Sequence, residues 1–231
     1  MSTNTVTFIH RPIIDAFLSK ITIHIPFSYL WIYKKSVGNP KTILDVGCGD
    51  GLLMQRLSKG ENWEIDGIDI YKSSVKLARE KGIYKNLIVG DVVKSCEKLI
   101  KSKKKYDTVF CSQLIEHITK SDGQKLIALM DKIAIKRVVV ATPIGFMNQP
   151  EVFIKGNPHQ HHKSGWSVDE MKNHGYKVNG LGFKFSWSEC GIGRNSNSLV
   201  VLVSVVIAYI MSPFVYFVPQ LAAGMMCIKT K

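Results

Sequence analysis

The chain has 231 residues, of which 45% are hydrophobic and 21% charged. This composition excludes a disordered chain and suits one compact α/β domain with modest additions. The formal net charge of +13 would suit a nucleic-acid partner. Much of that excess comes from one stretch, residues 94–105, in which six lysines are opposed only by Glu97.

The five cysteines are scattered, odd in number and without CxxC or Cys/His zinc spacing. They predict neither a disulfide framework nor a structural zinc site, and they indicate a reducing compartment. Met1 to His10 lack a basic region followed by a long apolar run, so we expect no secretory signal there.

Residues 1–41 are expected to form a helical arm, rich in large apolar side chains and broken by Pro26. From Thr42 onward, β-type runs alternate with helical stretches, which is typical of a parallel sheet with crossover helices. The expected strands are Thr42–Val46, Glu64–Ile70, Asn86–Val89, Tyr106–Cys111, Arg137–Ala141, Tyr176–Leu181 and Met225–Lys229. The expected helices are Leu52–Lys59, Ser73–Lys81, Val93–Lys101, Gln124–Ile133 and a short one that begins at Asp169 and ends at Gly175. The chain then divides into the arm (1–41), a core (42–182), an apolar insert (183–224) and a final strand (225–231).

Residues 43–51 read ILDVGCGDG, an apolar strand that enters a glycine-rich turn. Glycines let the backbone turn sharply and approach a ligand closely. The spacing G-x-G-x-G differs from the G-x-G-x-x-G of dinucleotide enzymes. Asp45, two residues before the first glycine, favours a cationic ligand over a pyrophosphate.

Two further acids follow the next strands: Asp69 after the second and Asp91 after the third. Because consecutive parallel strands bring their carboxyl ends to one edge of a sheet, we expect all three acids to converge on one crevice. Asp69 is placed to accept both hydroxyls of a ribose, and Asp91 to accept from an adenine amino group.

With these residues in view, the chain resembles the class I S-adenosylmethionine-dependent methyltransferases and, within them, the type 11 methyltransferases. The resemblance runs from about Thr42 to Gly182 and is carried by DVGCGDG, IDI, GDV and SQLIEHI. It implies a Rossmann-like α/β sheet, mostly parallel with an antiparallel last strand, and S-adenosylmethionine as cofactor. The residues it implies for the cofactor are Asp45, Gly47, Cys48, Gly49, Asp69, Ile70, Asp91, Val92, Ser112 and Gln113. The alternative is a Rossmann-like domain that binds another nucleotide, or none.

Methyl transfer to a hydroxyl needs positioning and a general base, and histidine suits that role near neutral pH. Glu116 and His117 follow the fourth strand, which makes His117 one candidate base. The alternative is an imidazole that only orders its loop through backbone hydrogen bonds.

The loop from Asn157 to Trp166 follows the fifth strand and is expected over the substrate crevice. His162 is the second candidate base. His159, His161 and Trp166 are the expected substrate contacts. The H-x-H-H spacing has no obvious carboxylate partner, so no metal site is expected.

The lysine run leads into the amino end of the fourth strand, opposite the cofactor crevice, and is interpreted as a solvated helix face. The insert differs, since no charged residue lies between Arg194 and Lys229. Its apolar run from Leu199 to Val218 would be about 30 Å long as a helix, the thickness of a hydrocarbon core, but Pro213 and Pro219 interrupt it. Because both ends of the insert emerge at the cofactor edge, we expect a helix pair or a re-entrant hairpin that contacts a membrane around residues 199–223, or a buried lid.

The sequence therefore predicts an S-adenosylmethionine-dependent methyltransferase of a small-molecule or lipid-linked acceptor, acting on oxygen, in the cytoplasm at the inner face of the membrane. An RNA methyltransferase, which the charge would suit, and a non-catalytic binding protein on the same fold are the alternatives. Neither the acceptor nor the atom methylated follows from the sequence.

Overall fold

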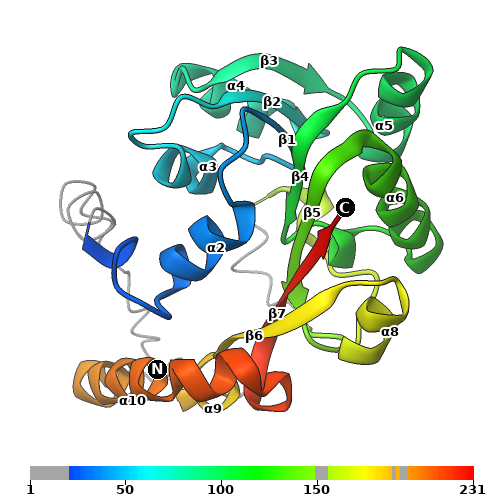
Figure 1. Cartoon of the computed structure of the whole chain (residues 1–231). Helices are drawn as coiled ribbons and strands as arrows, with labels where there is room; N and C mark the ends of the chain where they lie inside the picture. Colours follow the sequence, from blue (N-terminus) through cyan, green and yellow to red (C-terminus); the bar gives the residue numbers. More distant parts are fainter. Residues whose placement is uncertain (1–20, 149–155, 189–190, 193–196) are drawn as a thin grey trace.

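The computed structural model describes residues 21–148, 156–188, 191–192 and 197–231 (Figure 1). A seven-stranded sheet in the order β3-β2-β1-β4-β5-β7-β6 forms its centre. Every strand pair is parallel except those that involve β7, which runs antiparallel to both β5 and β6. The strands are β1 (Thr42–Val46), β2 (Glu64–Asp69), β3 (Tyr84–Val89), β4 (Tyr106–Ser112), β5 (Ala134–Pro143), β6 (Lys177–Phe183) and β7 (Ala222–Thr230). The predicted fold class, mostly parallel with an antiparallel last strand, is confirmed.

Two helical layers cover the sheet. One face is packed by α5 (Val92–Lys101), α6 (Lys120–Ile133) and α8 (Val168–Asn173), and the other by α2 (Tyr29–Val37) and α3 (Leu52–Leu57) (Figure 1). Helix α4 (Lys72–Glu80) connects β2 to β3. Every core helix and strand expected from the sequence is present, with bounds that differ by a few residues because ends depend on local capping. Helix α6 begins earliest relative to expectation, at Lys120, since the Thr119 side chain accepts from the Asp122 amide and caps it.

The arm is only partly described, and the part predicted for residues 1–20 lies outside the described residues. Its second piece is α2, which starts at Tyr29 after the break that Pro26 predicts. The Ser28 side chain caps α2 by accepting from the Trp31 amide. Leu30, Tyr33 and Val37 bury one face of α2 against the sheet, so this helix is an integral part of the core.

The apolar insert leaves the sheet at the carboxyl end of β6 and returns at the start of β7, beside the end of β5. Its two ends therefore emerge at one edge, as expected. It contains a one-turn helix, α9 (Lys184–Trp187), and one long helix, α10 (Ser198–Phe217), followed by a 3-10 turn, Pro219–Leu221. Within the described residues, the expected helix pair or re-entrant hairpin is thus replaced by one long helix, α10, with the one-turn α9 before it. Pro213 is accommodated inside α10.

Close packing holds α10 against β6. Gly180 in β6 has no side chain, and a Cβ built there would lie 2.1 Å from the carbonyl oxygen of Val215. The Asn179 amide donates to the Tyr216 carbonyl at 3.2 Å, and the Ser186 hydroxyl to the Ser204 carbonyl at the same distance. Only the face of α10 that carries Ser204, Ala208 and Val215 is buried. The helix therefore lies along the edge of the molecule with most of its surface uncovered.

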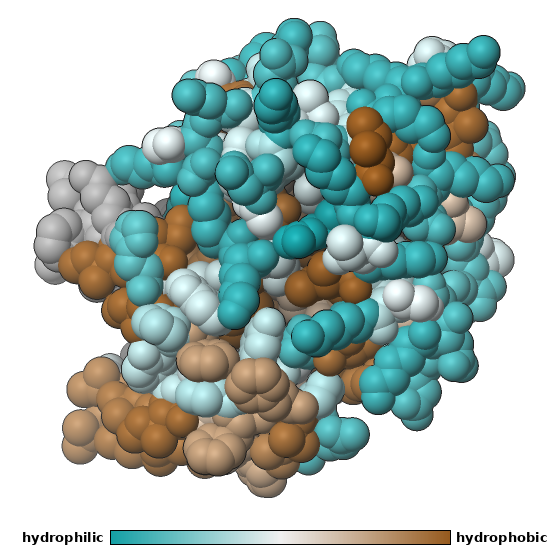
Figure 2. All heavy atoms as spheres, in the orientation of Figure 1, coloured by the Kyte–Doolittle hydropathy of each residue, from teal (hydrophilic) through white to brown (hydrophobic). Residues whose placement is uncertain are grey.

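Large apolar side chains gather on the outer face of α10. Figure 2 shows them as a brown area at the lower left, over the helix labelled α10 in Figure 1. Val203 and Ile207 are 49% and 45% exposed there. Others on the same surface are Leu199, Leu202, Val206, Ile210, Phe214 and Phe217. Within the described part of the chain, α10 is the one helix with the length and composition of a membrane-crossing segment.

Candidate active site

The glycine turn between β1 and α3 forms the floor of the site. The amides of Gly47 and Cys48 both donate to the Ile68 carbonyl, at 2.8 and 3.0 Å, which ties the turn to the end of β2. Gly47 has φ 76°, and a Cβ there would lie 2.8 Å from the Leu114 side chain. A glycine is thus required both for the backbone angle and for the space.

The three strand-end acids lie where the sequence predicts them. Asp45 is buried and accepts from the Tyr84 hydroxyl at 2.7 Å, and burial raises the pKa of its carboxyl to about 7. Asp69 accepts from the amides of Gly49 and Tyr71, at 2.9 and 2.8 Å. Asp91 caps α5 by accepting from the Lys94 amide at 2.9 Å. Each carboxylate still has lone pairs that can accept from a ligand.

A cavity of about 520 Å³ opens among these residues. Every residue predicted to hold the cofactor lines it: Asp45, Gly47, Cys48, Gly49, Asp69, Ile70, Asp91, Val92, Ser112 and Gln113. A Cβ built on Gly49 would meet no atom within 4 Å, so this turn faces open space. The cavity thus offers room, two acceptor carboxylates and a backbone that a ligand can approach closely, which fits S-adenosylmethionine.

The arm contributes site residues that the sequence analysis missed. Tyr29 lines the cavity, and its hydroxyl donates to Tyr33 at 2.9 Å. The Tyr33 hydroxyl lies 2.9 Å from Ser112 Oγ, and burial raises the pKa of Tyr33 well above its usual value. The spacing of four residues, which places Tyr29 and Tyr33 on one helix face, is the signal that could have found this pair.

The loop from Asn157 to Trp166, which carries the predicted histidines, is fixed near its carboxyl end by hydrogen bonds. Its backbone amides at Lys163 and Ser164 donate to the Glu116 carbonyl, at 2.7 and 3.1 Å. Ser164 Oγ also donates to the Ile115 carbonyl at 2.9 Å. These bonds fasten the loop to the turn that follows β4, although the two segments are far apart in the sequence.

The three predicted substrate contacts, His159, His161 and Trp166, lie in different environments. His159 lines the cofactor cavity. His161 is exposed, and its carbonyl faces Nδ1 of His117 at 3.3 Å. Trp166 is only 1% exposed and donates to the Ile115 carbonyl. It has almost no surface to offer a substrate and serves as the anchor of the loop.

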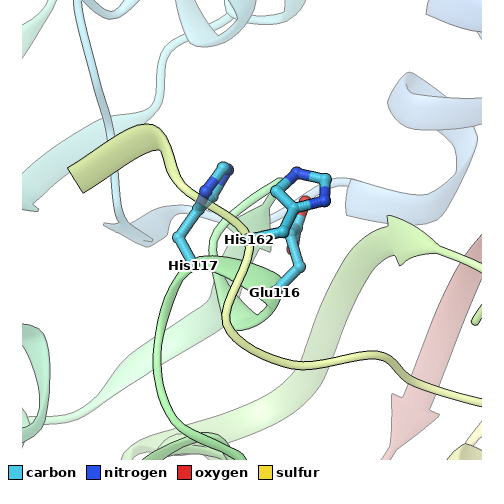
Figure 3. Close-up of side chains that lie close together, drawn as sticks. All are labelled: Glu116, His117 and His162. Carbon is cyan, nitrogen blue, oxygen red and sulfur yellow. The ribbon is translucent and has the colours of Figure 1, made fainter. Parts of the chain in front are cut away.

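The two candidate bases lie side by side, with Glu116 behind them (Figure 3). The rings of His117 and His162 are 4.7 Å apart between centroids. His117 lines the cofactor cavity, and burial, with a smaller contribution from His162, lowers its pKa to about 4. Burial also lowers the pKa of His162 and raises that of Glu116 to about 7. At neutral pH both imidazoles are therefore uncharged, and each has one ring nitrogen with a free lone pair.

A second cavity, of about 540 Å³, adjoins the first. Its wall is mostly apolar and comes largely from α2, α10 and the ends of β6 and β7. Tyr29 and Gln113 line both cavities. Gln113 adopts φ 52°, and its backbone amide donates to the Ala141 carbonyl at 2.8 Å. The apolar space therefore meets the cofactor space beside the turn after β4.

Comparison with known proteins agrees with this fold. Residues 43–134 match a family model described as a methyltransferase domain. A ubiquinone biosynthesis O-methyltransferase of Coxiella burnetii is 32% identical over 87 residues, 38% of this chain and 36% of that protein. The match thus spans about a third of the length of this curated relative.

Two solved structures share the whole fold. A SAM-dependent methyltransferase from Archaeoglobus fulgidus superposes with a TM-score of 0.56 at 19% identity, over 96% of this chain and 100% of that one. Magnesium protoporphyrin IX methyltransferase from Synechocystis PCC 6803, with bound SAH, gives 0.52 at 14% identity, over 100% and 90%. Residues 43–134 thus match a methyltransferase domain, and the chain has the fold of the class I S-adenosylmethionine-dependent methyltransferases, as the sequence predicts.

Proposed function

We propose that this protein is an S-adenosylmethionine-dependent O-methyltransferase whose acceptor carries a hydroxyl group and an apolar tail. The observation that carries the proposal is the meeting of two cavities at Tyr29 and Gln113, one polar and lined by the cofactor motif, the other apolar. A cofactor in the first cavity and a tail in the second would bring the reacting groups together at this junction. The matching relatives are named for O-methyl transfer in ubiquinone biosynthesis, which supports such an acceptor.

In this proposal the chain's own residues bind and orient the reactants. The carboxylates of Asp69 and Asp91 accept from the cofactor's ribose and adenine, and the Gly47 turn holds its methionine part. Bound S-adenosylmethionine would supply the methyl group from its sulfonium, and the sulfur would leave as the neutral thioether of S-adenosylhomocysteine. His117, uncharged and lining the cavity, accepts the hydroxyl proton.

We further propose that α10 lies in the surface of a membrane. Its outer face carries apolar side chains without any charge, while its inner face is fixed to β6. Burial of each exposed Val, Leu, Ile or Phe in lipid would stabilise binding by roughly 1.5–3 kcal/mol before ordering costs. The apolar cavity lies against α10, so a lipid-linked acceptor could pass from the bilayer to the site. The described cysteines are all unpaired, which supports the cytoplasmic face.

An acceptor pair tests the proposal. Labelled S-adenosylmethionine would be incubated with an alkyl-tailed catechol in phosphatidylglycerol vesicles, and with catechol in solution. We expect transfer to the tailed acceptor at a kcat/KM at least tenfold higher. No transfer to either acceptor, or to any lipid extract, would contradict the proposal, and transfer to RNA would favour the alternative suggested by the net charge.

A variant pair locates the tail. Val205 and Val206 are adjacent in α10, but only Val205 lines the apolar cavity. Val205→Trp should fill that cavity, raise KM for the tailed catechol and leave cofactor affinity unchanged. Val206→Trp adds the same bulk on the outer face and should leave KM within about twofold. Equal effects of both substitutions would show that the apolar cavity does not hold the tail.

A further inference from the structure

Three potential metal ligands from two distant segments converge beside the cofactor cavity. Glu116 and His117 come from the turn after β4, and His162 comes from the loop after β5 (Figure 3). One ligand atom from each lies within 4.8 Å of the others. The carboxylate that the loop's own H-x-H-H spacing lacks is therefore supplied by the other segment.

The carboxylate of Glu116 is unusual because it is buried and only one of its two oxygens has a hydrogen-bond partner. Glu116 is 2% exposed, and its Oε2 accepts from Thr142 Oγ1 at 3.0 Å. Its Oε1 is also buried and has no hydrogen-bond partner. A buried carboxylate oxygen without a partner is rare in folded proteins, and an ion is one of the few groups that explains it.

The two imidazoles are fixed in the tautomer that a cation requires. Nδ1 of His162 lies 2.6 Å from the Met147 carbonyl, and Nδ1 of His117 lies 3.3 Å from the His161 carbonyl. Because a carbonyl oxygen can only accept, each Nδ1 carries the proton and each Nε2 carries a lone pair. Backbone carbonyls orient metal-binding histidines in the same way.

We propose that Glu116, His117 and His162 bind one divalent transition-metal cation, with Zn²⁺ as the preferred ion. Two neutral nitrogens and one carboxylate suit zinc and its neighbours better than magnesium, which prefers oxygen ligands throughout. With metal–ligand distances of about 2.0–2.2 Å, binding would draw the ligand atoms together by roughly 1 Å. Three protein ligands leave a fourth position open, as in catalytic zinc sites.

The location of the cation suggests a role in methyl transfer, and this part of the inference rests on the proposed function. His117 lines the cofactor cavity, so the open position faces the space where the acceptor would lie. A hydroxyl bound there would lose its proton more readily, because a cation stabilises the resulting oxyanion. With a cation bound, His117 acts as a ligand, and the proton passes to solvent rather than to its ring.

Metal binding by the purified full chain, stripped with chelator, tests the site without any assay of methyl transfer. Titration with ZnCl₂ should show one bound equivalent. Co²⁺ bound in its place should give the visible absorption bands of a four-coordinate site. Glu116→Gln keeps the shape of the side chain, and His162→Ala removes one ring. Each should weaken Zn²⁺ binding by at least the roughly 10–100-fold that loss of an outer-shell partner costs.

His161→Ala is the matched control, because the backbone carbonyl of His161 is the part that faces His117 and the substitution retains it. It should bind Zn²⁺ as the wild type does. Retained binding of S-adenosylhomocysteine would show that every variant is folded. The absence of stoichiometric binding, or equal affinity in wild type, Glu116→Gln and His162→Ala, would overturn the inference. Zinc binding without methyl transfer to any acceptor would leave the metal site standing and contradict only the proposed function.

Discussion

The hydroxyl of Tyr84, in β3, donates a 2.7 Å hydrogen bond to Oδ2 of Asp45, in β1, across the intervening strand β2. The ring passes over Gly67 of β2, where a Cβ would lie 3.0 Å from it. Tyr84 is thereby the partner of the acid that begins the cofactor motif. A residue on the third strand thus lowers the pKa of a residue on the first, against the larger effect of burial, which raises it.

Tyr84→Phe removes this bond and leaves a buried carboxylate with one partner fewer. We expect the free energy of unfolding to fall by about 1–3 kcal/mol, because the desolvation of Asp45 is no longer offset. Thermal or urea denaturation measures the effect. Tyr71→Phe serves as a control, since only the backbone amide of Tyr71 bonds to Asp69. An unchanged midpoint in Tyr84→Phe would show that the bond contributes nothing to stability.

Asp69→Ala should weaken binding of both S-adenosylmethionine and its demethylated product. A ribose-binding carboxylate lost from a partly buried site costs about 1.5–3 kcal/mol, or roughly 10–150-fold in Kd. Isothermal calorimetry would measure both ligands. Equal affinities in variant and wild type would contradict the ribose assignment, and binding of a nicotinamide dinucleotide would contradict the cofactor assignment.

The pKa of Asp45 makes both stability and cofactor affinity depend on pH. Burial raises its pKa from 3.8 to about 7, so the folded state holds a proton that the unfolded state has released between these values. Stability from this group is therefore present at low pH and lost as pH rises from about 4 to about 7. The difference in unfolding free energy between Asp45→Asn and wild type should grow across this window. A pH-independent difference would show that Asp45 has an ordinary pKa.

Cofactor binding should have the opposite dependence, because the ionised form of Asp45 attracts a cationic ligand. We expect the affinity of the wild type for S-adenosylmethionine to rise from pH 6 to pH 8, and that of Asp45→Asn to change less. Calorimetry at both pH values gives the comparison. A steeper rise in Asp45→Asn than in the wild type would assign the pH dependence to another group.

Charged residues on the outer face of α10 should release the protein from lipid. Val203→Lys with Ile207→Glu places charges at half-exposed positions, so the fold and the cofactor affinity should be preserved. Flotation with vesicles would compare this variant with Leu77→Lys, which adds a charge at a similarly exposed apolar site on α4. Wild-type protein that stays soluble without detergent and never floats would mean that α10 meets no lipid.

Gly180→Ala should loosen the attachment of α10 to the sheet. The added methyl group would lie 2.1 Å from the Val215 carbonyl oxygen, so the helix must move. We expect a loss of about 1–3 kcal/mol in the free energy of unfolding, together with faster proteolysis of residues 198–217. Gly90→Ala, whose methyl group would meet only Ser95 Oγ at 3.4 Å, is the control. Equal stability of the two variants would contradict this account.

The core could be predicted because it depends on local signals. Apolar runs that end in Asp45, Asp69 and Asp91 identify strands, and parallel strands bring their ends together whatever the helices do. This reasoning placed the three acids around one cavity, and the resemblance supplied the other cofactor residues that line it. The antiparallel last strand followed from the resemblance rather than from the residues alone.

What escaped prediction depends on contacts between distant segments. The pairing of Glu116 with His162 joins residues on two loops, so no spacing within either loop reveals it. The line from Tyr29 through Tyr33 to Ser112 requires α2 to pack on the core, which the apolar character of the arm does not specify. Helix α10 stays in one piece because β6 supports it, whereas Pro213 suggested a break.

Gln113 holds a left-handed backbone conformation that costs a residue other than glycine roughly 1–2 kcal/mol. The residue lines both cavities, and strained backbone conformations of this kind are often found at functional sites. Gln113→Gly would relax the turn and could raise thermal stability while removing the side chain from the junction. Selection for greater stability alone would therefore favour the loss of this glutamine, and the stabilised protein would lack the one side chain in the turn after β4 that lines both cavities.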